Sequence, residues 1–140
     1  LESTGAEFFV LSLLLTQGIE AYKSYVNQPG YDLVAVYRAT GRTCRIQVKC
    51  RTAKKAPKQF LIDNLGSDVV VHVRLNRVAE GEAWSHTSPD VWVLPIQVVE
   101  RAADPRSKLG KVRLSQIGDL EAYRDAWHVI RAHLENRSTT

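Results

Sequence analysis

Methionine, long apolar runs and signal-type basic residues near the N-terminus are missing from this sequence of 140 residues. No methionine occurs, not even at position 1, so we expect at least the initiator residue to be absent from the chain. The longest nearly apolar run covers residues 8–15, far short of a bilayer span. Glu2 and Glu7 precede it, where a signal peptide would carry positive charge. The sequence therefore predicts a cytoplasmic protein with no membrane partner.

Cysteine is also scarce, because Cys44 and Cys50 are the only two. On one extended strand their Cα atoms would lie about 20 Å apart, beyond disulfide reach, so we expect both to be reduced. The composition, 44% hydrophobic and 24% charged, is that of a folded globular protein and excludes disordered chains and disulfide scaffolds. A chain of this length predicts a single domain over residues 1–140.

Acidic residues are absent between positions 38 and 58, although the whole chain carries a net charge of only +4. This stretch leaves the rest of the chain with a net charge of −4, so positive charge is concentrated in one place. A basic patch on an acidic body favours a polyanionic partner, with DNA expected and RNA left open, although a solvated charged hairpin also fits. The eight basic residues of the stretch are Arg38, Arg42, Arg45, Lys49, Arg51, Lys54, Lys55 and Lys58.

Hydrophobic periodicity and turn residues predict an α/β arrangement. A first helix is expected over residues 4–17 with Thr4 as its cap, and a last amphipathic helix over 120–134 with Asp119 as its cap. The polar segments 52–59 and 76–89 are expected to be loops, and residues 27–30 a turn. This order predicts a mixed sheet of about five strands flanked by helices. The expected strands cover residues 19–25, 31–38, 43–51, 68–75 and 90–95, and a short helix covers 96–103.

Two of these strands carry further information. The four-residue connection 39–42 predicts a hairpin between strands 31–38 and 43–51. Nearly continuous valine over residues 69–73 predicts a strand covered on both faces. Strand 43–51 alternates, so one face is expected to be core and the other cationic. The core face holds Cys44, Ile46, Val48 and Cys50, and the other holds Arg45, Gln47, Lys49 and Arg51.

The predicted hairpin groups residues able to hold a divalent cation. Gln47 and Lys49 are two apart on one strand and therefore project to the same side, and Asp32 on the neighbouring strand can reach the same cleft. A carboxylate, an amide oxygen and a backbone carbonyl are the hard oxygen ligands that Mg²⁺ prefers. Lysine can position an attacking water and offset charge that develops on a phosphate.

These residues resemble the motif of the PD-(D/E)xK nuclease superfamily. The similarity runs over residues 4–58: Tyr31-Asp32, a hairpin turn and Gln47-Val48-Lys49 follow a helix that carries Glu7. It is greatest to archaeal Holliday-junction resolvases and Mrr-like restriction nucleases, some of which end the motif with QxK. The resemblance implies a restriction-endonuclease-like sandwich, Mg²⁺ or Mn²⁺ as cofactor, DNA as substrate and a homodimer.

The resemblance also implies a role for each residue of the motif. Asp32 would be the central metal ligand and Gln47 would take the second acidic position, with the carbonyl of Val48 as a backbone ligand. Lys49 would be the catalytic lysine, and Glu7 the helix glutamate that binds metal directly or through water. Gln47 replaces a carboxylate, so the site should hold Mg²⁺ more weakly than its relatives do.

Each of these residues also has a purely structural explanation. Asp32 is typical of a strand start, and Gln47 with Lys49 is typical of an exposed edge strand. Glu7 with Thr4 matches a capping box, in which the carboxylate needs no metal.

Residues outside the motif are assigned more simply. Expected phosphate contacts are Arg45, Arg51, Lys54, Lys55 and Lys58. The histidines lack metal-ligand spacing and are interpreted as surface or structural residues: His72, His86, His128 and His133. Trp92 and Trp127 are expected in the core, Trp84 and His86 are weak candidates for base contacts, and Cys50 is expected to be a small buried hydrophobe.

The sequence thus predicts a metal-dependent endonuclease that hydrolyses DNA, with a preference for DNA structure as a further expectation. The alternative is a nuclease-fold module that binds nucleic acid with weak or no catalysis, because Gln47 stands where a carboxylate is usual. A third class, an interaction domain that ignores nucleic acid, would show no retention on DNA at low salt.

Overall fold

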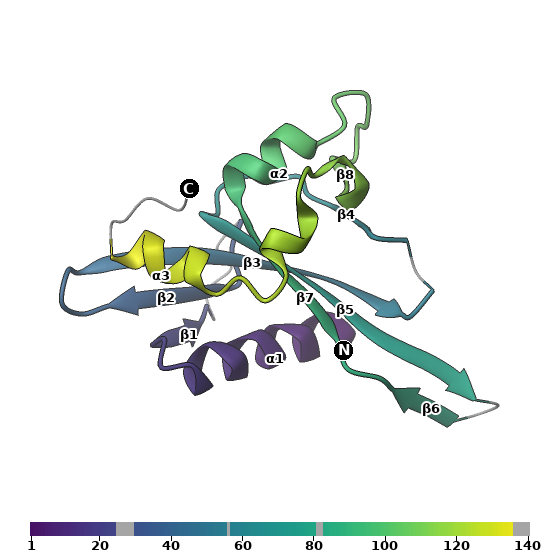
Figure 1. Ribbon diagram of the computed structural model, residues 1–140, viewed down its shortest axis with the longest axis horizontal. Helices are drawn as coiled ribbons and strands as arrows, with labels where there is room; N and C mark the ends of the chain where they lie inside the picture. Colours follow the sequence, from purple (N-terminus) through teal and green to yellow (C-terminus); the bar gives the residue numbers. More distant parts are fainter. Residues whose placement is uncertain (25–29, 56, 81–82, 136–140) are drawn as a thin grey trace.

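The computed structural model (Figure 1) describes residues 1–24, 30–55, 57–80 and 83–135. Its helices are α1 (Glu2–Thr16), α2 (Ile96–Ala102) and α3 (His128–Leu134), with 3₁₀ turns at Leu114–Gln116 and Leu120–Tyr123. Its strands are β1 (Ala21–Lys23), β2 (Leu33–Tyr37), β3 (Arg42–Ala53), β4 (Gln59–Leu61), β5 (Val69–Glu80), β6 (Ala83–His86), β7 (Asp90–Pro95) and β8 (Lys111–Arg113). No helix in the described part of the chain has the length and apolar character needed to cross a bilayer.

The main sheet is mixed and is built around β3 and β5. Strands β1, β2 and β3 form an antiparallel meander, β3 and β5 run parallel, and β7 and β6 are antiparallel to β5. Because β7 pairs with residues 69–74 of β5 and β6 with residues 77–80, these two strands occupy successive stretches of one edge. The sheet is therefore five strands wide, and the predicted α/β fold with a mixed sheet is confirmed. Strands β4 and β8 form a separate two-stranded sheet.

Each face of the sheet carries its own hydrophobic core. One face packs against α1 and α3, and the other against α2 and the β4–β8 pair. Figure 1 shows α1 and α2 on opposite sides of the sheet. Alternate valines of β5 serve both cores: Val71 and Val73 contribute to the first and Val70 to the second. The prediction that the valine-rich strand is covered on both faces is confirmed.

The two cap predictions are wrong. Helix α1 begins at Glu2 after Leu1 and has no side-chain cap, so Thr4 lies inside the helix. Asp119 stands before the 3₁₀ turn Leu120–Tyr123 but makes no side-chain cap hydrogen bond. Asp125, inside the predicted helix, has left-handed backbone with φ of 48°, which a continuous helix cannot include. The predicted helix over 120–134 is therefore broken into a 3₁₀ turn and the shorter α3.

Two predicted loops are partly strand. Strand β3 runs on to Ala53, and Gln59 begins β4 within the predicted loop 52–59. Strand β5 continues to Glu80 and β6 forms in the segment expected to be a polar connection. Both extensions depend on pairing between residues distant in sequence, which local polarity does not report. The predicted turn residues 27–29, and Tyr25 of the first expected strand, lie outside the described residues.

Candidate active site

The candidate site lies where β2 and β3 part. Strand β2 pairs with residues 42–46 of β3, and β3 continues beyond this pairing. Asp32 stands just before β2, and its N–H donates to the carbonyl of Ile46 at 2.8 Å. Its carboxylate Oδ2 accepts the backbone N–H of Val48 at 2.8 Å. The Asp32 side chain therefore takes over the hydrogen bond that a longer β2 would have made.

A cavity of about 400 Å³ opens along this edge of β3, and we call it the edge cavity. Glu7 reaches it from α1, Asp32 from the start of β2, and Gln47 and Lys49 from β3. The four side chains singled out in the sequence thus line one space. Val48 and Arg51, also singled out, line it as well.

Two carboxyl groups meet in the edge cavity. Burial raises the pKa of Asp32, the N–H of Val48 opposes that rise, and the charge of Glu7 and a hydrogen bond with it raise the pKa further. The positive charge of Lys49 acts in the opposite direction. Two neighbouring carboxylates repel each other unless a cation lies between them. This arrangement favours a bound cation when both groups are ionised.

Gln47 contributes an oxygen with no other use. Its side chain is 8% exposed, and Oε1 is buried with no hydrogen-bond partner among the described residues. A buried amide oxygen without a partner is costly, because folding removes its contact with water. An amide oxygen and two carboxylates are suitable ligands for Mg²⁺ or Mn²⁺. The residues present therefore fit a divalent cation.

Glu7 has a protein partner as well. Lys23 of β1 forms an ion pair with Glu7 Oε2, and both side chains are largely buried. The Lys23 ammonium also lies 5.2 Å from the centre of the Phe8 ring. The capping-box explanation for Glu7 fails because Thr4 does not cap α1. Lys23 was not found from the sequence, since no local pattern links a helix residue to a lysine on another element.

His72 supports the backbone of Lys49 from the other side of β3. The two residues are paired in the parallel β3–β5 register, and His72 Nδ1 lies 3.0 Å from the carbonyl of Lys49. A carbonyl only accepts, so Nδ1 carries the proton and donates it. His72 is fully buried between Phe60 and Trp92, and burial lowers its pKa to about 4. It is a structural residue, as predicted, and holds the strand that carries Lys49.

The predicted phosphate contacts are not all in one place. Arg51 lines the edge cavity and donates to the carbonyl of Gln59 at 2.9 Å. Lys58 lies 5.5 Å from the centre of the Trp92 ring. Lys54 and Lys55 line a second cavity beyond the end of β3.

The remaining assignments concern the core. Trp92 and Trp127 are buried, as predicted. Cys50 is only half-buried but packs against the first core, while Cys44 is fully buried within it. Cys44 and Cys50 are both free thiols, as expected.

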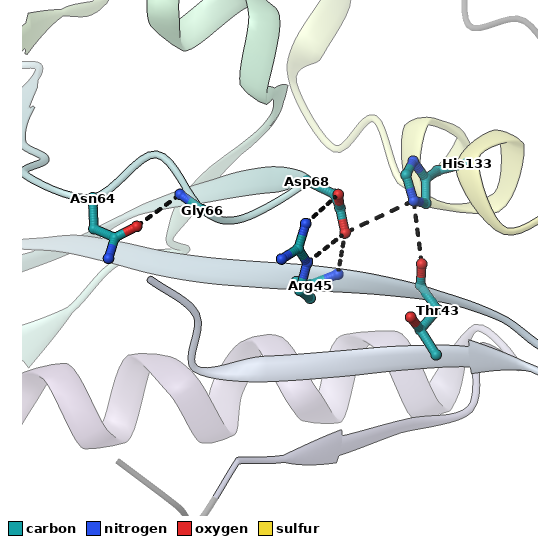
Figure 2. Close-up of polar contacts among 6 residues, drawn as sticks. All are labelled: Thr43, Arg45, Asn64, Gly66, Asp68 and His133. Atoms are coloured by element: carbon teal, nitrogen blue, oxygen red, sulfur yellow. Dashed lines mark hydrogen bonds and ion pairs between the residues drawn. The ribbon is translucent and has the colours of Figure 1, made fainter. Parts of the chain in front are cut away.

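Figure 2 shows polar contacts that join Arg45 to Asp68 and His133 to Thr43 and Asp68. Cys44 lies close to Asp68 and His133, and we call the five residues Thr43, Cys44, Arg45, Asp68 and His133 the clasp. The possible ligand atoms of Cys44, Asp68 and His133 lie within 4.8 Å of one another. However, Asp68 accepts the backbone N–H of Arg45 at 2.8 Å and its guanidinium at 3.2 and 3.3 Å. These bonds outweigh burial and lower the pKa of Asp68.

Two further contacts define what the clasp does. Nε2 of His133 lies 3.2 Å from the carbonyl of Thr43 and 3.8 Å from Asp68. Burial raises the pKa of Cys44, so its thiol stays protonated and is a poor metal ligand. The contacts favour a structural role in which the clasp joins α3 to the sheet.

Comparisons with known proteins place this geometry in a wider context. No protein-family model matches the sequence, and a search of curated proteins finds no match. The structure is similar to that of the bacterial homing endonuclease I-Ssp6803I, with a TM-score of 0.56 and 21% sequence identity. The likeness covers 93% of this chain and 90% of that one. The chain therefore shares the fold of that protein.

Proposed function

We propose that the chain is a divalent-metal-dependent endonuclease of the PD-(D/E)xK type that hydrolyses phosphodiester bonds in DNA. The observation that carries the proposal is the convergence of Glu7, Asp32, Gln47 and Lys49 on one cavity. The unpartnered Gln47 oxygen and the paired carboxyl groups support a cation there. The homing-endonuclease neighbour supports DNA as the substrate.

In this proposal the protein supplies ligands and position. Asp32, Glu7, Gln47 Oε1 and the carbonyl of Val48 would hold Mg²⁺ or Mn²⁺. When bound, such an ion lowers the pKa of a coordinated water and neutralises negative charge on the phosphate. Lys49 extends into the same cavity, where its ammonium orients the attacking water and balances charge that develops on the phosphate oxygens. His72 bonds the backbone carbonyl of Lys49, so the point from which the Lys49 side chain extends is fixed.

The direct test is cleavage of supercoiled, nicked and branched DNA with Mg²⁺ or Mn²⁺. We expect Asp32→Ala and Lys49→Ala to reduce the cleavage rate by about 10²-fold or more, because each removes a group that acts on the reacting atoms. Lys108→Ala changes an exposed lysine outside the residues that line the cavity and should cleave like wild type. If no DNA is cut, or if Asp32→Ala and Lys49→Ala cut like wild type, the catalytic proposal is wrong.

A second candidate function is DNA binding without catalysis. It is favoured by two observations, the amide at position 47 and the commitment of Glu7 to Lys23. Gln47→Glu separates the two functions. It adds a negative charge to the site, so an active enzyme should bind Mn²⁺ more tightly and cut DNA faster. Gln97→Glu, on the exposed face of α2, is the matched control. A Gln47→Glu protein that binds DNA but never cuts it would favour the binding module.

A homodimer, a cytoplasmic location, RNA as a second ligand and a preference for DNA structure remain predictions from the resemblance and the composition. Sedimentation of the protein alone and with a DNA duplex tests the first of these.

A further inference from the structure

A larger cavity lies beyond the end of β3, away from the edge cavity. It measures about 1020 Å³ and is lined by residues 53–55 of β3 and the turn that follows, by residues 74 and 76–78 of β5, and by Asp90. We call it the basic cavity, because four of its lining side chains are cationic: Lys54, Lys55, Arg74 and Arg77. Ala53 is four residues from Lys49 along the same strand, a distance of about 13 Å.

An irregularity in β5 shapes the basic cavity. The β3–β5 register pairs Arg51 with Arg74 and then Ala53 with Arg77, so β5 carries one extra residue over this stretch. In a regular strand, residues three apart face opposite sides, yet Arg74 and Arg77 line the same cavity. Re-aiming of side chains is a known effect of β-bulges, which are common near functional sites.

Asn76 holds the irregularity in place. It has a left-handed backbone with φ of 56° and is 6% exposed. Its amide donates to the carbonyl of Ser88 at 2.9 Å and to Asp90 Oδ2 at 3.0 Å. Its backbone carbonyl accepts a hydrogen bond from the hydroxyl of Thr87 at 3.2 Å. Asparagine adopts the left-handed conformation more readily than most other non-glycine residues, and these bonds maintain it at Asn76.

The basic cavity has an excess of positive charge. Asp90 is its one acidic lining residue among those described, and it is already bound by Arg124 at 2.6 Å and by Asn76. Arg74 Nε is buried with no hydrogen-bond partner among the described residues. A buried guanidinium N–H without an acceptor is costly, and an anionic oxygen is its best partner. Arg77 is partly engaged, since it lies 3.6 Å from Glu2.

We propose that the basic cavity binds a backbone phosphate of the DNA a few nucleotides from the bond that the edge cavity would cut. Arg74 supplies a half-buried guanidinium whose Nε lacks a partner among the described residues, and Lys54 and Lys55 close over the phosphate from the end of β3. The inference rests on the proposed DNA substrate and adds a second contact point to it. Its contribution is affinity and alignment, because phosphate contacts position a duplex without reading its sequence.

The test is the salt dependence of DNA binding, measured by fluorescence anisotropy with a labelled duplex and EDTA to prevent cleavage. Removal of one side chain that binds a phosphate should reduce the slope of log Kd against log salt by about 1. We therefore expect a reduction of about 1 for Arg74→Gln and of up to about 2 for Lys54→Gln combined with Lys55→Gln. Lys108→Gln removes one exposed charge elsewhere and should leave the slope unchanged.

One further variant, together with the lysine double variant, keeps the test informative. Arg74→Lys retains the charge and loses the fork of donors, so it should keep the slope of wild type with weaker binding. The lysine double variant changes only exposed residues, so it carries the test if Arg74→Gln fails to fold.

The outcomes separate this inference from the proposed function. Reduced slopes in a protein that never cuts DNA support the basic cavity and contradict the nuclease proposal. Normal DNA cleavage with unchanged salt slopes in the Arg74→Gln and lysine variants overturns the phosphate site in the basic cavity and leaves the nuclease proposal standing. Absence of DNA binding by wild type also overturns it. Tight binding of free AMP that disappears in Arg74→Gln, with unchanged DNA slopes, overturns it in favour of a small-anion site.

Discussion

The two halves of β3 differ in how their polar groups are used. Residues 42–46 have β2 on one side, and both of their arginines are engaged: Arg45 with Asp68 and Arg42 with the carbonyl of His133. Residues 47–53 extend beyond the pairing with β2 but still pair with β5. In this second half Gln47 has an unpartnered oxygen and Lys49 extends into a cavity. One strand therefore serves the fold in its first half and presents chemical groups in its second.

The difference shows how a sheet creates a site without a long loop. Strand β2 starts at Leu33, opposite Ile46, whereas β3 runs on to Ala53. Beyond Ile46 this edge of β3 therefore needs another hydrogen-bond partner, and the Asp32 carboxylate provides it for Val48. The same carboxylate is then held beside Gln47 and Lys49. Rigid strands fix such positions better than mobile segments do.

The largest expected effect is at Asp32, which bonds the backbone of Val48 and also lines the edge cavity. Asp32→Asn should lower the affinity for Mn²⁺ by about 100-fold or more, measured by calorimetry, since a charged ligand is lost. The same change should raise Tm at neutral pH. The folded protein holds the Asp32 proton more tightly than the unfolded chain does, so stability from this group is lost as pH rises through its raised pKa. In Asp32→Asn the amide oxygen can still accept the Val48 N–H, and no buried negative charge forms as the pH rises.

Asp63→Asn, at an exposed site outside the residues that line the edge cavity, is the control and should change neither quantity. A fall in Tm for Asp32→Asn would show that the Asp32 charge serves the fold, and the contrast between the two halves of β3 would then disappear.

The next effect concerns Lys23, which competes with a cation for Glu7. Lys23→Met should tighten Mn²⁺ binding by about tenfold, because the carboxylate is released and a positive charge is removed. Arg38→Met breaks a similar pair with Glu20 and should have no effect on Mn²⁺ binding. Calorimetry again measures both, and weaker binding in Lys23→Met would mean that Lys23 positions Glu7 for the cation.

A third effect concerns acid stability, which His72 controls behind the second half of β3. Its pKa is about 4 in the folded protein and near 6.5 when unfolded, so the unfolded chain takes up the proton first. Stability should therefore fall as pH drops from about 6.5 to about 4, by at most about 1.4 kcal/mol per pH unit from this group.

Urea unfolding across this pH range tests the effect of His72. His72→Gln should flatten the fall relative to wild type, while His128→Gln, at an exposed site, should leave it in place. Equal slopes in wild type and His72→Gln would assign the acid sensitivity to other groups.

The smallest effect is expected in the first half of β3. Arg45→Gln should lower the free energy of unfolding by about 0.5–1 kcal/mol, because it removes a partly exposed ion pair with Asp68. The salt slope of DNA binding should stay the same, in contrast to Arg74→Gln. A slope reduced by about 1 would show that Arg45 contacts phosphate, as its place in the basic stretch suggests.

Local patterns were sufficient to predict the hairpin, the valine strand and the side of the sheet on which Asp32, Gln47 and Lys49 meet. Strand alternation places Gln47 and Lys49 on one side, and a short hairpin connection brings Asp32 beside residues 46–48 of β3. Few strand registers satisfy both conditions, so their grouping depended little on distant parts of the chain.

The partners of these residues could not be predicted in the same way. The pairing of Glu7 with Lys23, of Lys49 with His72 and of Arg45 with Asp68 each depends on how separate elements dock. The bulge at Asn76 likewise depends on the parallel register of β3 and β5. Register between distant strands is determined by packing of the whole sheet, and a single sequence carries little local trace of it.

The clasp has a practical consequence. Cys44 is fully buried in the first core, and its ligand atom lies within 4.8 Å of His133 on α3. In a Cys50→Ser background, the remaining thiol can react with a reagent only when α3 lifts from the sheet or the whole domain opens. The labelling rate of this one sulfur would then time the departure of a seven-residue helix, with no probe added to the protein.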